Sequence, residues 1–411
     1  MAGRGDQEAG HGSGPKAPTV PVTPPALPLA PIDGYISQMR EEFGSLATCL
    51  LAEDGDPDEF YQAALDLYAL FNDIGGRPQD IVGPEAFTWQ QETRLAAGMA
   101  INPFSAATCL LDDLRTRAFA GGVRDAIKAA QEQYPGERIE VLYAGTGPFA
   151  PLALLQTPFF GSDEVRFTLI DIHPAALACQ AQIISVLGLE PYIEATIQAD
   201  ATQWQPPGGK KYHIAVAEVM ERGLITEPQV AVTQMIANHL RSDGFLVPER
   251  IDLSLCLMCP EAEQERAEQS RDRLGEYFDL SGDSITDITP VLGDSAAPDR
   301  IFIDRVFSLT KSVAADYGIT ETGTIPLPAI QLPDQLPPGL ALRVLTEITT
   351  FGNFALGDYA SGLTFPEPLV DPPPLTPGGS YALGYETLGV PGLRLSQSEV
   401  PRSNQRDERS N

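Results

Sequence analysis

Strands that alternate with helical stretches run through the middle of the chain, and this alternation constrains the fold most. Apolar and β-branched runs occur at residues 138–144, 165–171, 193–197 and 213–217. The first, second and fourth runs are each followed by a turn and by residues at helical spacing. Strands joined by helices form a parallel sheet with crossovers of one hand and helices on both faces. The sequence therefore predicts a doubly wound α/β domain over residues 105–248.

The pattern changes on both sides of this domain. Residues 32–76 carry leucines, alanines and aromatic side chains at helical spacing, and this predicts an N-terminal helical section that we place at residues 33–104. Residues 249–395 alternate apolar and polar side chains between prolines and glycines, as is typical of an antiparallel β domain. Residues 1–32 are rich in glycine and proline with almost no aromatic anchor, and we expect them and residues 396–411 to be disordered tails.

The length and composition suit a globular chain with a sizeable core. The chain has 411 residues and 43% hydrophobic content, enough for two or three domains. A formal charge of −29 opposes binding to nucleic acid, whose phosphates need a basic surface, and gives no support for an anionic membrane surface. The same charge favours a cationic substrate.

Cysteine usage and hydropathy predict a cytoplasmic protein. The five cysteines are an odd number and scattered, which fits reduced thiols. No run of about 18 apolar residues is present to span a bilayer, and the first residues lack the apolar stretch of a secretory signal. Cys256 and Cys259 form an isolated pair without a nearby histidine, so we expect no metal site.

A glycine-rich turn follows the first predicted strand. Gly145, Thr146 and Gly147 lead into an apolar helical stretch, and small residues here let a ligand approach bare backbone at a helix N-terminus. Asp171 ends the next strand, where an acid can accept hydrogen bonds from both hydroxyls of a ribose. The same acid could instead cap the helix that begins at Pro174. The pattern indicates a cofactor of the nicotinamide or S-adenosylmethionine kind, although small residues also close such turns in folds that bind nothing.

Two glutamates leave the end of the fourth predicted strand. Glu218 directly follows the strand at residues 213–217, and Glu227 lies nine residues further on. Ligands of open α/β sheets bind at the carboxyl ends of the strands, which is where this pair begins. Two carboxylates that converge on one point suit a guanidinium. The alternative is that both glutamates are merely solvated.

These motifs, in this order, resemble those of class I S-adenosylmethionine-dependent methyltransferases. The stretch from about residue 109 to 255 is more closely similar to the protein arginine methyltransferase family. Asp112-Asp113-Leu114-Arg115-Thr116 resembles the helix before that family's sheet, and the spacing of Glu218 and Glu227 is the most specific match. The resemblance implies a Rossmann-like class I methyltransferase fold with N-terminal helices and a C-terminal antiparallel β-barrel-like domain.

The resemblance also implies roles for particular residues. Arg115 would pair with the carboxylate of the methionine part of S-adenosylmethionine, a contact suited to a bidentate guanidinium. Glu218 and Glu227 would clamp the substrate guanidinium, with Met220 packed near the cofactor. The remaining cofactor-binding residues would be Gly145, Thr146, Gly147, Asp171 and Asp200, the last of them beside the adenine.

The chain departs from the family's pattern at several positions. Tyr143 replaces an acid at the end of the first strand, and Val219 stands where many members have an aromatic residue. The C-terminal β domain contains no histidine and no tryptophan, so the family's threonine-histidine-tryptophan loop is absent. By position, Tyr359 or Phe365 is the candidate to wall the substrate site in its place, unless these are loop aromatics without a role.

The leading hypothesis is an S-adenosylmethionine-dependent N-methyltransferase that acts on a guanidino group. Free arginine or a related small metabolite is preferred to a protein arginine, because the loop that closes the arginine pocket is absent. A methyltransferase for another small-molecule oxygen, carbon or amine nucleophile and an inactive methyltransferase-fold scaffold stay open as alternatives. The resemblance further implies a homodimer through an arm on the β domain, for which residues 261–277 are the candidate.

Overall fold

The structure is a computed structural model that describes residues 33–76, 88–274, 299–316 and 323–397. The tail predicted for residues 1–32 lies outside the described residues. The tail predicted for residues 396–411 overlaps the last strand by two residues and otherwise lies outside them as well.

A five-stranded parallel sheet forms the centre of the α/β part, as the alternating pattern predicts. Its strands lie in the order β5-β4-β3-β6-β7, and every neighbouring pair is parallel. The strands are β3 (Ile139–Ala144), β4 (Val165–Asp171), β5 (Ile193–Gln198), β6 (Tyr212–Ala217) and β7 (Leu240–Val247). Because the chain reverses its direction of winding between β3 and β6, the sheet has a topological switch point there.

Helices cover both faces of this sheet, and the alternation of side chains along β3 shows which helix lies on which face. Val141 and Tyr143 belong to the core cluster that contains residues of α5 and α7, whereas Leu142 and Ala144 pack with α8. Side chains that alternate along a strand point to opposite faces. The helices are α5 (Asp113–Gln133), α6 (Pro151–Leu154), α7 (Pro174–Leu187) and α8 (Gln229–Ala237), with the short turns η3 (Glu190–Tyr192) and η4 (Pro207–Gly209) between strands.

The N-terminal section begins with two packed helices, α1 (Asp33–Leu50) and α2 (Pro57–Gly75). Asp56 caps α2 by accepting a hydrogen bond from the backbone of Asp58, and Pro57 suits the first helical position. The ring of Phe71 lies 5.3 Å from that of Phe149, which brings α2 against the glycine turn.

The last part of the section at residues 33–104, beyond the helical pattern of residues 32–76, contains strands as well as a short helix. The chain there forms an antiparallel hairpin of β1 (Thr93–Leu95) and β2 (Gly98–Ala100), followed by α4 (Pro103–Thr108) and η2 (Cys109–Leu111). Gly98 has a φ of 125°, and a Cβ at this position would lie 2.5 Å from the carbonyl oxygen of Thr226. Contact with residue Thr226, which is distant in the sequence, therefore accounts for the hairpin, and the hydrophobic pattern of residues 93–100 does not.

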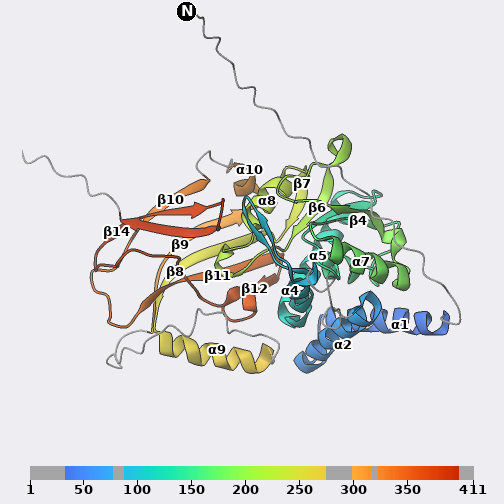
Figure 1. The fold of residues 1–411 in the computed structure, drawn as a ribbon, viewed down its shortest axis with the longest axis horizontal. Coiled ribbons are helices and arrows are strands. Elements are labelled where there is room, and N and C mark those ends of the chain that lie inside the picture. Colours follow the sequence, from blue (N-terminus) through green and yellow to red (C-terminus); the bar gives the residue numbers. More distant parts are fainter. Residues whose placement is uncertain (1–32, 77–87, 275–298, 317–322, 398–411) are drawn as a thin grey trace, which may run out of the picture.

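The C-terminal part consists of two antiparallel sheets, and a closed barrel is not seen among the described residues. One sheet has the order β12-β11-β8-β9, with β13 beside β11, and the other has the order β10-β14-β15. The strands of the first sheet are β8 (Arg250–Met258), β9 (Arg300–Thr310), β11 (Ala341–Phe351), β12 (Phe354–Leu356) and β13 (Glu367–Pro368). Those of the second are β10 (Thr324–Gln331), β14 (Ser380–Glu386) and β15 (Gly392–Gln397). Figure 1 shows this β domain beside the α/β part, which carries α1 and α2 on its outer side.

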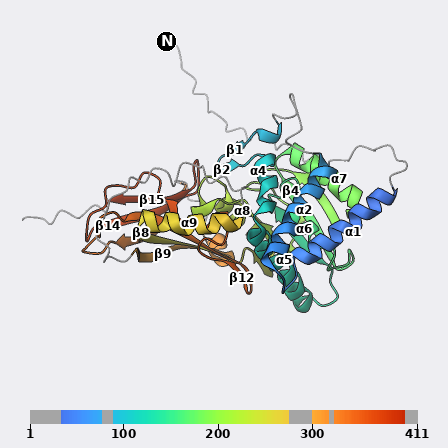
Figure 2. The same cartoon turned by 90° about the horizontal axis from the view of Figure 1, so that it is seen from below.

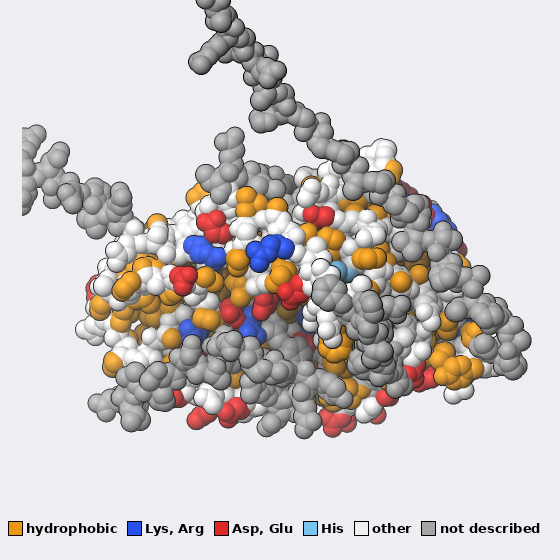
Figure 3. Space-filling model, in the orientation of Figure 1, with side chains coloured by type: hydrophobic (Ala, Val, Ile, Leu, Met, Phe, Trp, Pro, Cys, Tyr) orange, Lys and Arg blue, Asp and Glu red, His pale blue; other side chains and the backbone are white. Residues whose placement is uncertain are grey.

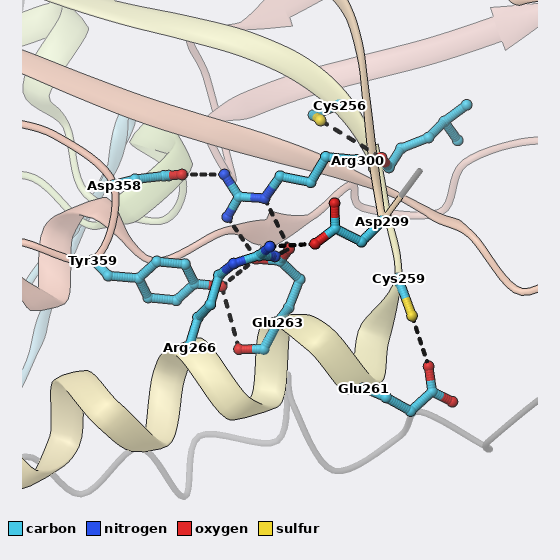
Figure 4. A network of polar contacts seen from close by, with 10 residues as sticks. Cys256, Cys259, Glu261, Glu263, Arg266, Asp299, Arg300, Asp358 and Tyr359 are labelled. Atoms are coloured by element: carbon cyan, nitrogen blue, oxygen red, sulfur yellow. Dashed lines mark hydrogen bonds and ion pairs between the residues drawn. The ribbon is translucent and has the colours of Figure 1, made fainter. Parts of the chain in front are cut away.

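Helix α9 (Pro260–Leu274) lies lengthwise against the β domain, as the view from below in Figure 2 shows. Ala267 of this helix is buried with Tyr359 and Phe365. Glu263 forms ion pairs with Arg266 and Arg300 in the network of Figure 4. The described part of the proposed dimer arm is thus packed on its own β domain. The remaining elements are α10 (Lys311–Asp316) and η6 (Gly362–Thr364).

The described surface and helices lack several features that define other classes of protein. In the face shown in Figure 3, the basic side chains lie interspersed with acidic ones and do not form one continuous surface. Within the described ranges, no helix is long and apolar enough to cross a bilayer. The same residues contain no group of three or more histidine, cysteine or acidic side chains arranged to hold a metal ion.

Candidate active site

A pocket opens at the carboxyl ends of the parallel strands, at the switch point between β3 and β6. It contains about 870 Å³ of space free of protein atoms, part of it open solvent. Its lining brings together most of the residues predicted from the sequence: Arg115, Gly145, Thr146, Gly147, Asp171, Asp200, Glu218 and Glu227. Residues more than 100 positions apart thus meet where an α/β sheet binds its ligands.

The glycine turn lines this pocket with bare backbone. Gly145 and Gly147 have φ values of 74° and 60°, a conformation that residues with a side chain rarely adopt. A Cβ on Gly145 would lie 2.0 Å from Cγ1 of Val219, so a larger residue cannot be placed there without moving the end of β6. Thr146 is buried behind the turn, where its hydroxyl accepts a hydrogen bond from Gln180. The helix α6 that follows the turn has only four residues. The turn therefore exposes glycine backbone to the pocket and not the N-terminus of a long helix.

Asp171 is positioned by backbone hydrogen bonds. Its Oδ2 accepts from the backbone of Gly147 and its Oδ1 from the backbone of His173, each at 2.8 Å. His173 is the N-cap residue of α7, and among the described residues no side chain caps this helix, so Asp171 holds the residue before the helix and does not cap the helix itself. Each carboxylate oxygen has two lone pairs, and Asp171 therefore keeps the capacity to accept hydrogen bonds from a ligand as well.

Asp200 lies at the opposite side of the glycine turn, in the loop after β5. Its Oδ1 accepts from the backbone and the hydroxyl of Thr202, and its Oδ2 accepts from the side chain of Gln203. The carboxylate is thus held in place by its own loop while it lines the pocket.

Arg115 and Glu218 form an ion pair inside the pocket. Nη2 of Arg115 lies 2.5 Å from Oε1 of Glu218, and the two side chains are 11% and 12% exposed. Arg115 is in the first turn of α5, whose N-cap residue Asp112 accepts from the backbone of Arg115 at 3.0 Å. Asp112 also accepts hydrogen bonds from Ser361 and Gly362 of the β domain. The structure therefore gives Arg115 a protein partner in addition to any ligand group that it binds.

Glu227 is the buried member of the glutamate pair. Glu227 is 6% exposed. Among the described residues, its carboxyl group has no hydrogen-bond or ion-pair partner. Burial, together with the negative charge of Glu218, raises the pKa of Glu227 from 4.5 to about 8. The two acids therefore differ: Glu218 is paired with a cation, and Glu227 holds its proton at neutral pH until a positive charge arrives.

Two further pocket residues, Cys109 and Tyr143, were not predicted as site residues. Burial raises the pKa of the Cys109 thiol to about 11, so the thiol stays protonated and poorly nucleophilic at neutral pH. Burial also raises the pKa of Tyr143 well above its usual value. The side chain of Tyr143 was noted from the sequence only as a departure from a family pattern, and nothing in the sequence marked Cys109.

The hairpin of β1 and β2 closes one side of the pocket and was also missed. Leu95 and Ala100 line the pocket, and the backbone of Met99 donates a hydrogen bond of 2.9 Å to the carbonyl of Thr226. The hydroxyl of Thr93 lies 3.1 Å from Nε2 of His173. The only sequence signal for this hairpin was Gly98, and the need for glycine there comes from the carbonyl of Thr226 close to it.

Three residues predicted to contact the substrate do not line this pocket. Met220 is 3% exposed and belongs to the main hydrophobic core. Tyr359 and Phe365 line a separate, smaller cavity between α9 and the first β sheet, with their ring centroids 5.0 Å apart. Figure 4 shows Tyr359 directed at α9, where its hydroxyl donates to Glu263. Apolar packing and this hydrogen bond place the two rings in that second cavity, apart from the pocket lined by the glutamates.

Comparisons with known proteins gave structural similarities but no sequence relatives. No protein family model matches the chain, and no curated protein matches its sequence. One similar solved structure is the PRMT1 enzyme–prozyme heterotetrameric complex of Trypanosoma brucei with AdoHcy, with 18% identity and a TM-score of 0.42 over 68% of this chain and 86% of that chain. Another is protein arginine methyltransferase 10 of Arabidopsis thaliana, with 10% identity and a TM-score of 0.38 over 66% of this chain and 84% of that chain. With both TM-scores below 0.5, these similarities do not assign a reaction to this chain.

Proposed function

We propose that this protein is an S-adenosylmethionine-dependent N-methyltransferase that acts on a guanidino group. The observation that carries the proposal is Glu227, a buried carboxyl group without a partner among the described residues, in one pocket with the paired Glu218. Glu227 lines the open pocket, where burial disfavours its charged form, and a cation that forms hydrogen bonds with it would stabilise that form. A planar guanidinium supplies both the charge and the donors.

The rest of the pocket fits the cofactor. Gly145 and Gly147 leave backbone that a ligand can approach closely, and Asp171 keeps lone pairs for the hydroxyls of a ribose. Ile172 and Val232 add apolar surface for a flat base. Arg115 uses one N–H group on Glu218 and has others left for a carboxylate.

The glutamate pair explains how a guanidinium can become a methyl acceptor. When bound, S-adenosylmethionine supplies a methyl group on a positively charged sulfur. A guanidinium nitrogen is a poor nucleophile because its lone pair is delocalised. Glu218 and Glu227, by accepting hydrogen bonds from the other nitrogens, draw the positive charge away from the attacking nitrogen and orient it.

Glu227 is also suited to take a proton. As the bond between nitrogen and the methyl carbon forms, the bond between that carbon and sulfur would break and leave its electron pair on sulfur, and the attacking nitrogen must lose one proton. Before the substrate binds, burial holds the pKa of Glu227 near 8. Once the guanidinium has ionised it, Glu227 is a carboxylate that can accept this proton. Glu218 remains paired with Arg115 and serves to hold the substrate.

The acceptor is proposed to be a small guanidino compound such as free arginine, with a protein arginine as the alternative. The experiment is calorimetric binding of S-adenosylmethionine followed by mass spectrometry of products from arginine, agmatine and a glycine-arginine-rich peptide. Methylation of arginine or agmatine supports the small-molecule assignment, and methylation of the peptide alone supports the alternative. Cofactor binding without turnover of any guanidine would point to a different nucleophile, and absence of cofactor binding to a scaffold.

The role of Glu227 can be tested by comparing Glu227→Gln with a control variant in the same loop, Glu221→Gln. Glu227→Gln keeps the size of the side chain and removes its charge, and we expect turnover to fall by about 100-fold or more while cofactor affinity stays within twofold. Glu221→Gln removes a charge from the same segment and is expected to leave turnover nearly unchanged. Equal turnover in wild type and Glu227→Gln would remove the glutamate clamp from the proposal.

We also propose a cytoplasmic location and a homodimer that uses the outward face of α9. Ala267 packs inward against the β domain, so only the other face of this helix is available to a second copy. Small-angle scattering that gives the mass of a monomer would rule out the dimer.

A further inference from the structure

The segment that joins the two glutamates has an unusual backbone. Leu224 and Thr226 have φ values of 53° and 61°. Gly223, directly before Leu224, has a φ of 67°. Residues with a side chain adopt this left-handed conformation rarely, and they stay in it only where surrounding groups hold them. The position of Glu227, which directly follows Thr226, therefore depends on contacts made by the segment before it.

Most of those contacts come from the β domain. The hydroxyl of Tyr385 donates a hydrogen bond of 2.7 Å to the carbonyl of Leu224. The backbone of Gly223 donates to the hydroxyl of Thr346 at 2.8 Å. Arg222 forms an ion pair with Glu367 of β13. The C-terminal domain thus contacts each of three consecutive residues, which form the turn η5 (Arg222–Leu224).

Packing on all sides fixes the position of the Tyr385 hydroxyl. Its residue is fully buried at 0% exposure, and its ring stacks on Phe307 with centroids 5.0 Å apart and planes 4° apart. Its strand β14 lies between β10 and β15, where Tyr385 pairs with Ile325 and Leu393. A ring fixed by stacking and by strands on both sides presents its hydroxyl as a rigid donor.

We propose that Tyr385 is a positioning residue of the active site: through the carbonyl of Leu224 it holds the glutamate segment in its left-handed conformation and so keeps the Glu227 carboxyl buried in the pocket. The inference rests on the proposed function for its catalytic consequence. Its structural part, that a tyrosine of the β domain controls the environment of Glu227, stands on the contacts alone.

The test is Tyr385→Phe, which removes the hydroxyl and preserves the stacked ring. The matched control is Tyr381→Phe on the same strand and the same face. Tyr381 is 1% exposed, and its hydroxyl donates to the carbonyl of Pro374 and accepts from the backbone of Thr376, outside the glutamate segment. Thr346→Val, which removes the acceptor of Gly223, should act in the same direction as Tyr385→Phe.

For Tyr385→Phe we expect kcat for the guanidino acceptor to fall by about tenfold or more, with the dissociation constant of S-adenosylmethionine changed less than twofold. In the pH profile of kcat/KM, which reports the free enzyme, the apparent pKa of the basic group should also move from about 8 toward 4.5, because Glu227 becomes accessible to water. Tyr381→Phe should lose stability without either change. A merely structural role would lower the melting temperature of both variants and leave both pH profiles alike.

A second readout separates failure of this inference from failure of the proposed function. The difference in stability between each protein and its Glu227→Gln counterpart, measured against pH, reports the pKa of Glu227 without any substrate. If no guanidine is methylated but this pKa falls in Tyr385→Phe, the function is wrong and the positioning holds. If guanidines are methylated and Tyr385→Phe matches Tyr381→Phe in both rate and Glu227 pKa, the positioning is overturned.

Discussion

Arg115 and Glu218 meet at 2.5 Å although 103 positions separate them in the chain. Their contact joins the first turn of α5 to the end of β6, and so joins the helix before the sheet to the strand at the switch point. It also makes the two glutamates unequal. Glu218 has a cation beside it, whereas Glu227 is buried without one among the described residues and has its pKa raised to about 8.

Removal of Arg115 should be costly for folding. Arg115→Ala leaves Glu218 as a buried carboxylate without its partner, and we expect a loss of about 3 kcal/mol in the free energy of unfolding. Urea denaturation measures this loss. The double variant Arg115→Met with Glu218→Gln removes both charges and should regain part of it. A loss below about 1 kcal/mol for Arg115→Ala would show that the pair behaves as an exposed salt bridge.

Stability should depend on pH through Glu227. The unfolded chain releases the proton of Glu227 near pH 4.5, whereas the folded protein keeps it until about pH 8. The folded state binds more protons in this window, so this contribution is complete below pH 4.5 and is lost as the pH rises through 8. The loss is on the order of 4 kcal/mol. Denaturation at several pH values should show this slope in wild type and not in Glu227→Gln, and identical slopes would contradict it.

Binding of a cationic acceptor should release a proton. At pH 7 Glu227 is mostly protonated, and a guanidinium favours its charged form, so roughly 0.9 proton should leave on binding. Calorimetry in two buffers of different ionisation enthalpy measures this number. The affinity should rise by up to about tenfold from pH 6 to pH 7. Glu227→Gln is the control, since it has no proton to lose, and equal proton release by both proteins would place the titrating group elsewhere.

The glycine turn offers a comparison of two glycines with similar backbones. Gly145→Ala adds a Cβ 2.0 Å from Val219 to a residue with a φ of 74°, whereas Gly136→Ala adds one in open space at a φ of 81°. Both variants carry the cost of the left-handed backbone, about 1 to 2 kcal/mol. The clash should make Gly145→Ala less stable by a further 1 kcal/mol or so and should abolish cofactor binding. Thermal unfolding and calorimetry test this, and equal effects of the two variants would contradict it.

Local patterns were sufficient for the α/β part of the molecule. The strands β3, β4, β5 and β6 begin and end within one residue of their predicted bounds. The glycine turn, Asp171 and the start of α7 follow from residue types whose conformational preferences act over a few positions. The pocket at the switch point follows from the strand order, and this is why the predicted glycines, aspartates and glutamates line it together.

Long-range packing decided the remaining features. The hairpin at residues 93–100 has a shape set by Thr226, and Tyr359 and Phe365 turn to α9 because Ala267 and Glu263 give them apolar contact and a hydrogen bond there. The pairing of Arg115 with Glu218 and the burial of Glu227 depend on segments more than 100 residues away. Periodicity and turn chemistry are properties of neighbouring residues and can be read from the sequence. The partner and the water exposure of a side chain are properties of the whole packed chain, and only the tertiary structure determines them.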